Sequence, residues 1–95
     1  MAAYLIAQWK VGDPQTYQRY RDELRPLVDR FGGRFRVEDA AVEVLEGDPT
    51  NATMLMIEMP SREAARLLYD SPEYEPLRAL REQSAQGSLW LVEGS

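Results

Sequence analysis

Glu58 is the residue whose type and position most directly suggest chemistry, because it interrupts the otherwise apolar segment Met54–Pro60. A polar group in such a segment is either hydrogen-bonded or functional. A carboxylate in apolar surroundings is a stronger base than one in water, and in that role Glu58 would remove a proton beside a carbonyl group. The alternative is a structural glutamate at the end of a strand, which reaches solvent or forms an ion pair with Arg62 or Arg34.

Tyrosine hydroxyls are the expected partners of that carboxylate. Tyr69 and Tyr74 flank the helix-breaking segment Asp70–Pro72, so we expect at least one end of each ring to be exposed. Their hydroxyls would then orient a planar ligand. We therefore take Glu58 and Tyr69 as the catalytic candidates.

The remaining candidates would bind the ligand. Arg34 follows a double glycine and would hold a carboxylate through both guanidinium nitrogens, unless it is only a surface arginine at the start of a strand. Tyr20 lies with Tyr17 on the apolar stripe of a helix, where an aromatic residue is more simply part of the core. The ligand-binding candidates are Gln8, Tyr20, Arg34, Tyr74 and Trp90.

The composition limits the reactions that are available. The chain has 95 residues, 44% of them hydrophobic, which is typical of one globular domain. It contains neither cysteine nor histidine, so thiol nucleophiles, zinc thiolate sites and imidazole bases are excluded. The sequence also lacks a glycine-rich phosphate loop, a dinucleotide fingerprint and a closely spaced acidic triplet. We therefore predict no metal site and no cofactor.

The charge pattern bears on partners and location. A formal net charge of -5 argues against binding to nucleic acid. Basic residues instead alternate with acidic ones, and we predict helical ion pairs of Arg25 with Asp29, Arg66 with Asp70 and Arg78 with Glu82. No segment approaches the ~18 apolar residues of a membrane span, and the N-terminus lacks a basic leader. We expect a cytoplasmic protein with no membrane partner.

The elements that must position these residues begin with a strand at Tyr4–Trp9 and a helix capped by Asp13 and Pro14. That helix carries an apolar stripe, ends at Gly32-Gly33, and would kink or break near Arg25 because Pro26 follows it. Two alternating segments, Arg34–Asp39 and Val42–Glu46, read as an edge strand and its continuation.

The second half of the chain begins with the turn-forming segment 47–51, which would join this edge arm to the Met54 strand as a hairpin. Ser61 caps the next helix, which breaks at Asp70–Pro72 and restarts. The restarted helix would end at Gln86-Gly87, before a last strand at Leu89–Val92.

This order predicts an α+β fold of the ferredoxin-like βαββαβ type, a single domain over residues 1–95. Its antiparallel sheet would have the order 4-1-3-2, with the helices on one face. The first, third and fourth strands are apolar on both sides, so the uncovered face needs a partner. A homodimer formed through the sheet face would satisfy this requirement.

Short motifs along the whole chain carry a resemblance to a known family. They are Tyr4–Ala7 with Asp13-Pro14, Gly32–Phe35, Val42–Gly47, Ile57–Ser61, Ala64-Ala65, Tyr69–Tyr74 and Leu91–Gly94. In these motifs the chain resembles the "domain of unknown function 1330" family. The resemblance implies a dimeric α+β barrel, the architecture of the cofactor-independent quinol monooxygenases and muconolactone isomerases, and implies no reaction. Family members often carry a histidine late in the first strand, where this chain has Gln8.

These observations lead to one prediction and one alternative. The prediction is a homodimer that binds a small molecule between sheet and helices, as a cofactor-free monooxygenase- or isomerase-like enzyme or as a metabolite binder. The alternative is a non-catalytic dimerisation or regulatory ligand-binding module. A cavity separates the two, because a space filled by Trp9, Tyr17, Tyr20 and Trp90 would leave no room for a ligand.

Overall fold

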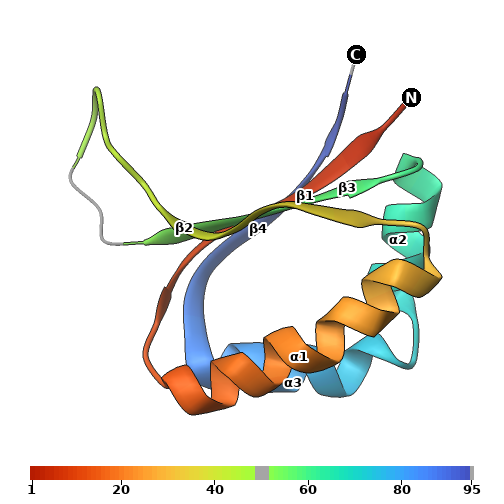
Figure 1. Ribbon diagram of the computed structural model, residues 1–95, viewed down its shortest axis with the longest axis horizontal. Coiled ribbons are helices and arrows are strands. Elements are labelled where there is room, and N and C mark those ends of the chain that lie inside the picture. The colour runs from red at the N-terminus through yellow and green to blue at the C-terminus, as the bar shows by residue number, and fades with distance from the viewer. Residues whose placement is uncertain (49–51, 95) are drawn as a thin grey trace.

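A computed structural model describes residues 1–48 and 52–94 of the chain. Its elements, in order, are β1 (Ala3–Val11), α1 (Pro14–Arg30), β2 (Arg34–Ala41), β3 (Thr53–Met59), α2 (Arg62–Asp70), α3 (Tyr74–Ser84) and β4 (Ala85–Glu93). The strands form one antiparallel sheet in the order β2-β3-β1-β4, and the helices lie together on one side of it (Figure 1). The predicted ferredoxin-like arrangement is therefore confirmed.

The ends of α1 follow from its sequence. Asp13 caps the helix by accepting a hydrogen bond from the Thr16 backbone N–H at 3.2 Å, and proline occupies the first helical position. The helix ends where Gly32 adopts a φ of +80°, a conformation that favours glycine. The predicted break near Arg25 does not occur, because the helix runs unbroken from Pro14 to Arg30 with Pro26 inside it. Leu24 and Leu27, which flank Arg25 and Pro26, are only 1% and 5% exposed and hold this part of the helix against the core.

The core lies between the sheet and the helices. Alternate residues of β1 and β3 point toward the helices and are buried, among them Trp9, Leu55 and Met59. The helices contribute the buried side chains that face them, including Leu24 and Leu68. Each large side chain that is fully buried in this layer stabilises the fold by about 1.5–3 kcal/mol.

The edge strand β2 is shorter and less regular than predicted. The predicted strand at Val42–Glu46 is wrong, because these residues form no strand and β2 ends at Ala41. Ala41 pairs with Thr53, the first residue of β3, so the chain beyond Ala41 has no partner strand. The antiparallel pairing of β2 with β3 agrees with the predicted hairpin connection. Residues 49–51 of the predicted turn lie outside the described residues.

The last strand begins earlier than predicted. Gln86 and Gly87 were expected to end a helix, but α3 ends at Ser84 and passes directly into β4. Gly87 pairs with Trp9 of β1, and a β-carbon at this position would lie 2.1 Å from the Gln8 carbonyl oxygen. The glycine therefore serves the close approach of two strands and does not terminate a helix.

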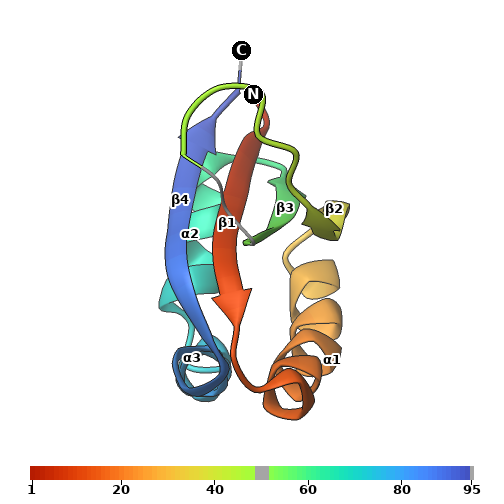
Figure 2. The same cartoon turned by 90° about the vertical axis from the view of Figure 1, so that its left-hand side faces the viewer.

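The other side of the sheet is the open face, which we define by Tyr4, Ile6, Gln8, Met54, Met56, Glu58, Trp90 and Val92. Figure 2 shows the four strands side by side, with the helices beyond or beside them. None of the helices within residues 1–48 and 52–94 covers this face. Trp90 and Val92 are 47% and 45% exposed there, so the open face presents apolar side chains to its surroundings. Within the described part of the chain, no helix is long and apolar enough to cross a membrane.

Candidate ligand-binding site

A small chamber lies in the core between the sheet and the helices. Its volume is about 20 Å³, which is the size of one water molecule. Side chains from β1, β3, β4 and all helices line it: Leu5, Ala7, Trp9, Tyr20, Leu24, Leu55, Ile57, Leu68, Tyr69, Tyr74 and Leu89. The chamber is thus mainly apolar, and most of the space predicted to hold a ligand is filled by aromatic and branched side chains.

A larger pocket adjoins this chamber along the edge formed by β4 and α2. It has a volume of about 240 Å³ and is lined by Leu5, Ala65, Arg66, Tyr69, Leu89, Trp90 and Leu91. Leu5, Tyr69 and Leu89 line both the chamber and the pocket. These three residues therefore separate the surface pocket from the interior of the domain, and we call them the partition.

Tyr69 is the polar member of this partition. Its ring lies 5.4 Å from the ring of Tyr74, between centroids, and its hydroxyl accepts a hydrogen bond from Arg78 Nη1 at 3.4 Å. The guanidinium carbons of Arg66 and Arg78 lie 5.9 and 5.5 Å from the centroid of the Tyr69 ring. Tyr69 is half-buried, and two guanidinium groups lie close to its ring.

Tyr20 and Tyr74 meet on the inner side of the partition, where their hydroxyl oxygens are 3.1 Å apart. Both side chains are 2% exposed, so the expected exposed end of Tyr74 is absent. Burial raises the pKa of Tyr20 well above its ordinary value and also raises the pKa of Tyr74. Both phenols are therefore neutral at physiological pH and can act as hydrogen-bond donors.

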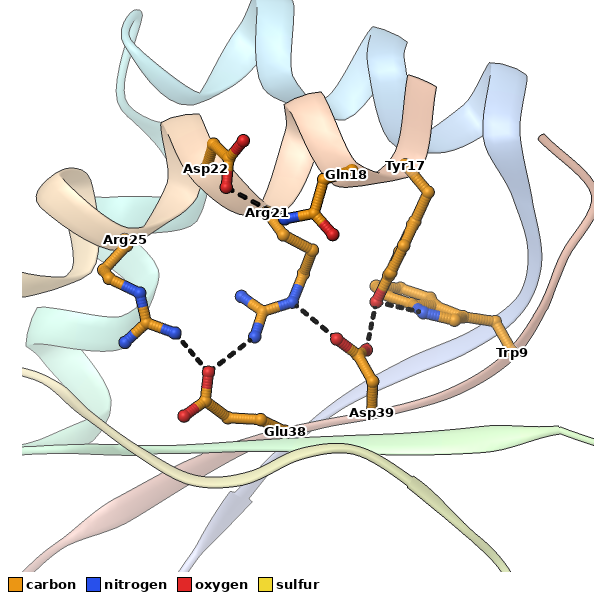
Figure 3. Close-up of polar contacts among 8 residues, drawn as sticks. All are labelled: Trp9, Tyr17, Gln18, Arg21, Asp22, Arg25, Glu38 and Asp39. Atoms are coloured by element: carbon orange, nitrogen blue, oxygen red, sulfur yellow. Dashed lines mark hydrogen bonds and ion pairs between the residues drawn. The ribbon is translucent and has the colours of Figure 1, made fainter. Parts of the chain in front are cut away.

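A second polar cluster, which we call the Asp39 cluster, lies between α1 and β2 (Figure 3). The Tyr17 hydroxyl donates a hydrogen bond to Asp39 Oδ1 and accepts one from Trp9 Nε1 at 3.0 Å. Arg21 Nε donates to Asp39 Oδ2 at 2.9 Å, and Arg21 Nη2 donates to Glu38 at 3.0 Å. Burial, followed by the hydrogen bond to Asp39, raises the pKa of Tyr17.

The Asp39 cluster was missed by the sequence analysis. Arg21 is only 6% exposed, although charged residues are rarely buried without partners. The spacing Tyr17, Arg21, Leu24, Val28 places Arg21 on the apolar stripe of α1, and this was the available signal. Asp39 has a φ of +53°, a left-handed conformation that aspartate tolerates better than most residues.

The outcomes of the predicted helical ion pairs differ. Arg66 forms the predicted pair with Asp70, at 2.9 Å from Nη2 to Oδ2. Arg25 was predicted to pair with Asp29 but pairs with Glu38, which it shares with Arg21. The cause is the approach of β2 to α1. A rule based on helical spacing considers only pairs within one helix and cannot predict a partner on a strand.

Glu58 lies on the open face, away from the chamber. It pairs with Tyr4 in the register of β1 and β3, and its Oε1 accepts a hydrogen bond from Arg36 Nε at 2.8 Å. Its side chain is 32% exposed. The ion pair predicted as the structural alternative is therefore present, but with Arg36 in place of Arg62 or Arg34.

The other open-face candidates surround Glu58. Arg34 is opposite Glu58 on β2 and is exposed, and Gln8 is opposite Met54 on the same face. Trp90 is opposite Ile6 and also borders the pocket at the β4 edge. The sheet thus separates Glu58, Gln8 and Arg34 from Tyr20, Tyr69 and Tyr74, so the predicted pairing of Glu58 with Tyr69 is not formed within the chain. The reason is strand parity, which the sequence analysis did not assign.

The four-stranded sheet, its helix-covered face and its open face define the class of protein, a ferredoxin-like α+β domain. The chain belongs to the family described as "Domain of unknown function (DUF1330)", whose model matches residues 2–95. The resemblance found in the sequence is thereby confirmed. No curated protein matches the chain in sequence.

Solved structures share the fold at low identity. The protein of unknown function RPA0582 from Rhodopseudomonas palustris is 16% identical, with a TM-score of 0.82, over 99% of this chain and 82% of that one. SnoaB from Streptomyces nogalater, described as a cofactor-independent oxygenase, is 14% identical, with a TM-score of 0.73, over 99% and 93%. A protein from Bacteroides fragilis, described as dimeric, of unknown function and with a ferredoxin-like fold, is 8% identical, with a TM-score of 0.66, over 98% and 96%. At these identities the similarity establishes the fold alone.

Proposed function

We propose that this protein is a homodimer in which each subunit binds a small, flat and mainly apolar molecule in the pocket between α2 and β4. The observation that carries the proposal is the pocket of about 240 Å³, which Leu5, Tyr69 and Leu89 separate from the chamber. Sites for drug-sized ligands span about 300–1,000 Å³, so this pocket fits a smaller molecule. Movement of the Tyr69 ring would join the pocket to the chamber and enlarge the site.

The open face supports the homodimer. Ile6 on β1 lies between Met56 on β3 and Trp90 on β4, so apolar side chains run across the centre of the sheet. Exposed apolar surface of this kind marks an interaction site. The Bacteroides fragilis protein, which shares the fold, is described as dimeric. A two-fold axis through the open face would cover both copies of this surface at once.

The groups inside the site support hydrogen-bond donation to a ligand oxygen. Tyr20, Tyr69 and Tyr74 provide phenols, and among the described residues that line the chamber or the pocket none is a carboxylate. Neutral phenols stabilise a developing negative charge on oxygen, as an enol or phenol acquires when it loses a proton. SnoaB, with the same fold, is described as a cofactor-independent oxygenase. We therefore favour oxygenase- or isomerase-like chemistry on the ligand, with the tyrosines as positioning groups.

A second candidate function, a non-catalytic dimerisation or regulatory module, is favoured by the small size of the chamber. At about 20 Å³ the chamber as it stands admits no organic ligand. In this form of the proposal the protein would use the open face to dimerise, and the edge pocket would hold a regulatory ligand or none.

Binding of a panel of small aromatic compounds, followed by native mass spectrometry, tests the proposal. Leu91→Trp would fill the pocket from β4, whereas Leu67→Trp adds the same ring to α2 at a side chain that is 64% exposed and outside the pocket. We expect panel members to bind the unmodified protein and Leu67→Trp, and to be lost from a folded Leu91→Trp variant. Equal binding by all three proteins would show that the ligand binds outside this pocket. If none of the three binds a panel member, the second candidate function, a non-catalytic module, is favoured.

A further inference from the structure

We infer that the pocket between α2 and β4 selects an aromatic anion, a carboxylate or a phenolate on a one- or two-ring system. This inference deepens the proposed function and rests on it. The observation behind it is that two arginines from different helices surround the one polar side chain of the partition. Arg66 on α2 lines the pocket, and Arg78 on α3 donates to the Tyr69 hydroxyl at 3.4 Å.

The rest of the pocket fixes the other end of the ligand. Leu5, Ala65, Leu89 and Leu91 line it with hydrocarbon, and Arg66 is its only charged lining residue among those described. Such a site favours a molecule with an apolar body and one charged group, placed where the apolar surface ends. A guanidinium binds a carboxylate through two parallel hydrogen bonds, which gives that end its geometry.

The present partner of Arg66 can be replaced by a ligand. Its Nη2 atom lies 2.9 Å from Asp70 Oδ2, but the two side chains are 58% and 55% exposed. Exposed pairs of this kind contribute little to stability, so a ligand carboxylate can displace Asp70 or share the guanidinium with it. Arg78 lies near Glu75 and Glu82 on its own helix, yet it donates its hydrogen bond to Tyr69. The positive charge of Arg78 is therefore directed toward the partition.

Because the chain as a whole is negatively charged, a preference for anionic ligands would indicate a local positive site. With a formal net charge of -5, the protein as a whole repels anions. Preferential uptake of an anion would therefore have a local cause, and it would weaken with added salt because the arginines are solvent-accessible.

The test uses three probes that share one ring system: naphthoate, naphthylmethanol and naphthylmethylammonium. Affinities are measured by titration calorimetry on the intact protein at low salt. We expect naphthoate to bind at least about tenfold more tightly than the alcohol, and the ammonium compound to bind most weakly. Arg66→Gln should remove most of the tenfold preference and leave the affinity for the alcohol within about twofold.

Matched variants guard against a general effect on folding. Arg19→Gln removes an exposed i,i+4 pair on α1, with Glu23, and should leave the affinity for naphthoate unchanged. Asp70→Asn frees Arg66 from its carboxylate and should strengthen naphthoate binding. Equal affinities for the acid and the alcohol, or a loss that is the same in Arg19→Gln and Arg66→Gln, would overturn the anion preference while the binding function stands. Failure of all three probes to bind would count against the proposed function itself.

Discussion

Asp39 joins β2 to α1 through two different side chains. One carboxylate oxygen accepts from the Tyr17 hydroxyl and the other accepts from Arg21 Nε at 2.9 Å, and the residue holds a φ of +53°. Asp39 is thus the point at which the edge strand is attached to the core.

Replacing Asp39 by alanine should destabilise the protein by about 2–4 kcal/mol, because it leaves the buried Arg21 guanidinium short of a partner. Asp39→Asn should cost less, since asparagine also tolerates left-handed backbone and keeps an acceptor. The measurement is urea unfolding at a fixed protein concentration. Arg19→Gln, which breaks an exposed pair, is the control and should change stability by less than about 0.5 kcal/mol. Equal effects of Asp39→Ala and Arg19→Gln would show that the cluster is not structural.

The buried phenols predict a loss of stability in alkali. Burial raises the pKa values of Tyr17, Tyr20 and Tyr74 above the ordinary 10.0, so above that pH the unfolded chain releases protons that the folded chain retains. The stabilisation is complete below pH 10 and is lost as the pH rises further. We expect the free energy of unfolding to fall by about 1.4 kcal/mol per pH unit for each protected phenol. Urea unfolding from about pH 9 to pH 11 measures this slope, which should be shallower in Tyr20→Phe; identical slopes would contradict the assignment.

At this scale the sequence predicted some site residues and misjudged others. The place of Tyr69 beside the helix break was predicted, because local sequence sets such a break. The separation of Glu58 from Tyr69 was not predicted, since one residue of strand register moves a side chain to the other face. The approach of Glu38 and Asp39 to α1 was not predicted either. The bulges of β2, between Phe35 and Val37 and between Val37 and Ala40, change which face of the sheet the following side chains lie on.

At the scale of elements, Gly87 controls how closely β4 pairs with β1. A β-carbon there would lie 2.1 Å from the Gln8 carbonyl oxygen and 2.5 Å from Trp9 Cα, and neither backbone atom can rotate away. Gly87 is therefore a packing residue, and it lies on the strand that borders the pocket.

Gly87→Ala should destabilise the protein by about 1–3 kcal/mol or more, because the added methyl group forces two strands apart. Gly12→Ala is the matched control, since its nearest neighbour, the Ser84 carbonyl oxygen, would lie 3.9 Å away. Thermal unfolding followed by circular dichroism should show a lower midpoint for Gly87→Ala and little change for Gly12→Ala. A tolerated Gly87→Ala would mean that β4 pairs with β1 less closely than described.

The order of the elements was predictable in large part because the starts of α1 and α2 depend on local sequence. Asp13 and Ser61 accept hydrogen bonds from the Thr16 and Ala64 backbone N–H groups, at 3.2 and 3.1 Å, as caps do. The ends of β2 and α3 were not predictable in the same way. They depend on where the partner strand begins, which is a property of the assembled sheet.

At the scale of the whole molecule, the open face should form the dimer interface. Met56 lies opposite Ile6 at the centre of that face, and a lysine there would have to bury its charge in the interface. We expect Met56→Lys to sediment as a folded monomer under conditions in which the unmodified protein is a dimer. Leu67→Lys, an exposed leucine on α2 away from the open face, should remain dimeric. A dimer that survives Met56→Lys would place the interface elsewhere.

Native mass spectrometry of the unmodified protein with the aromatic panel tests the central claim most directly, because it reports assembly and ligand uptake in one spectrum. We expect a dimer that takes up two equivalents of a small aromatic compound, one for each pocket. A monomer, or a dimer that takes up no member of the panel, would contradict the claim that this fold forms a ligand-binding homodimer.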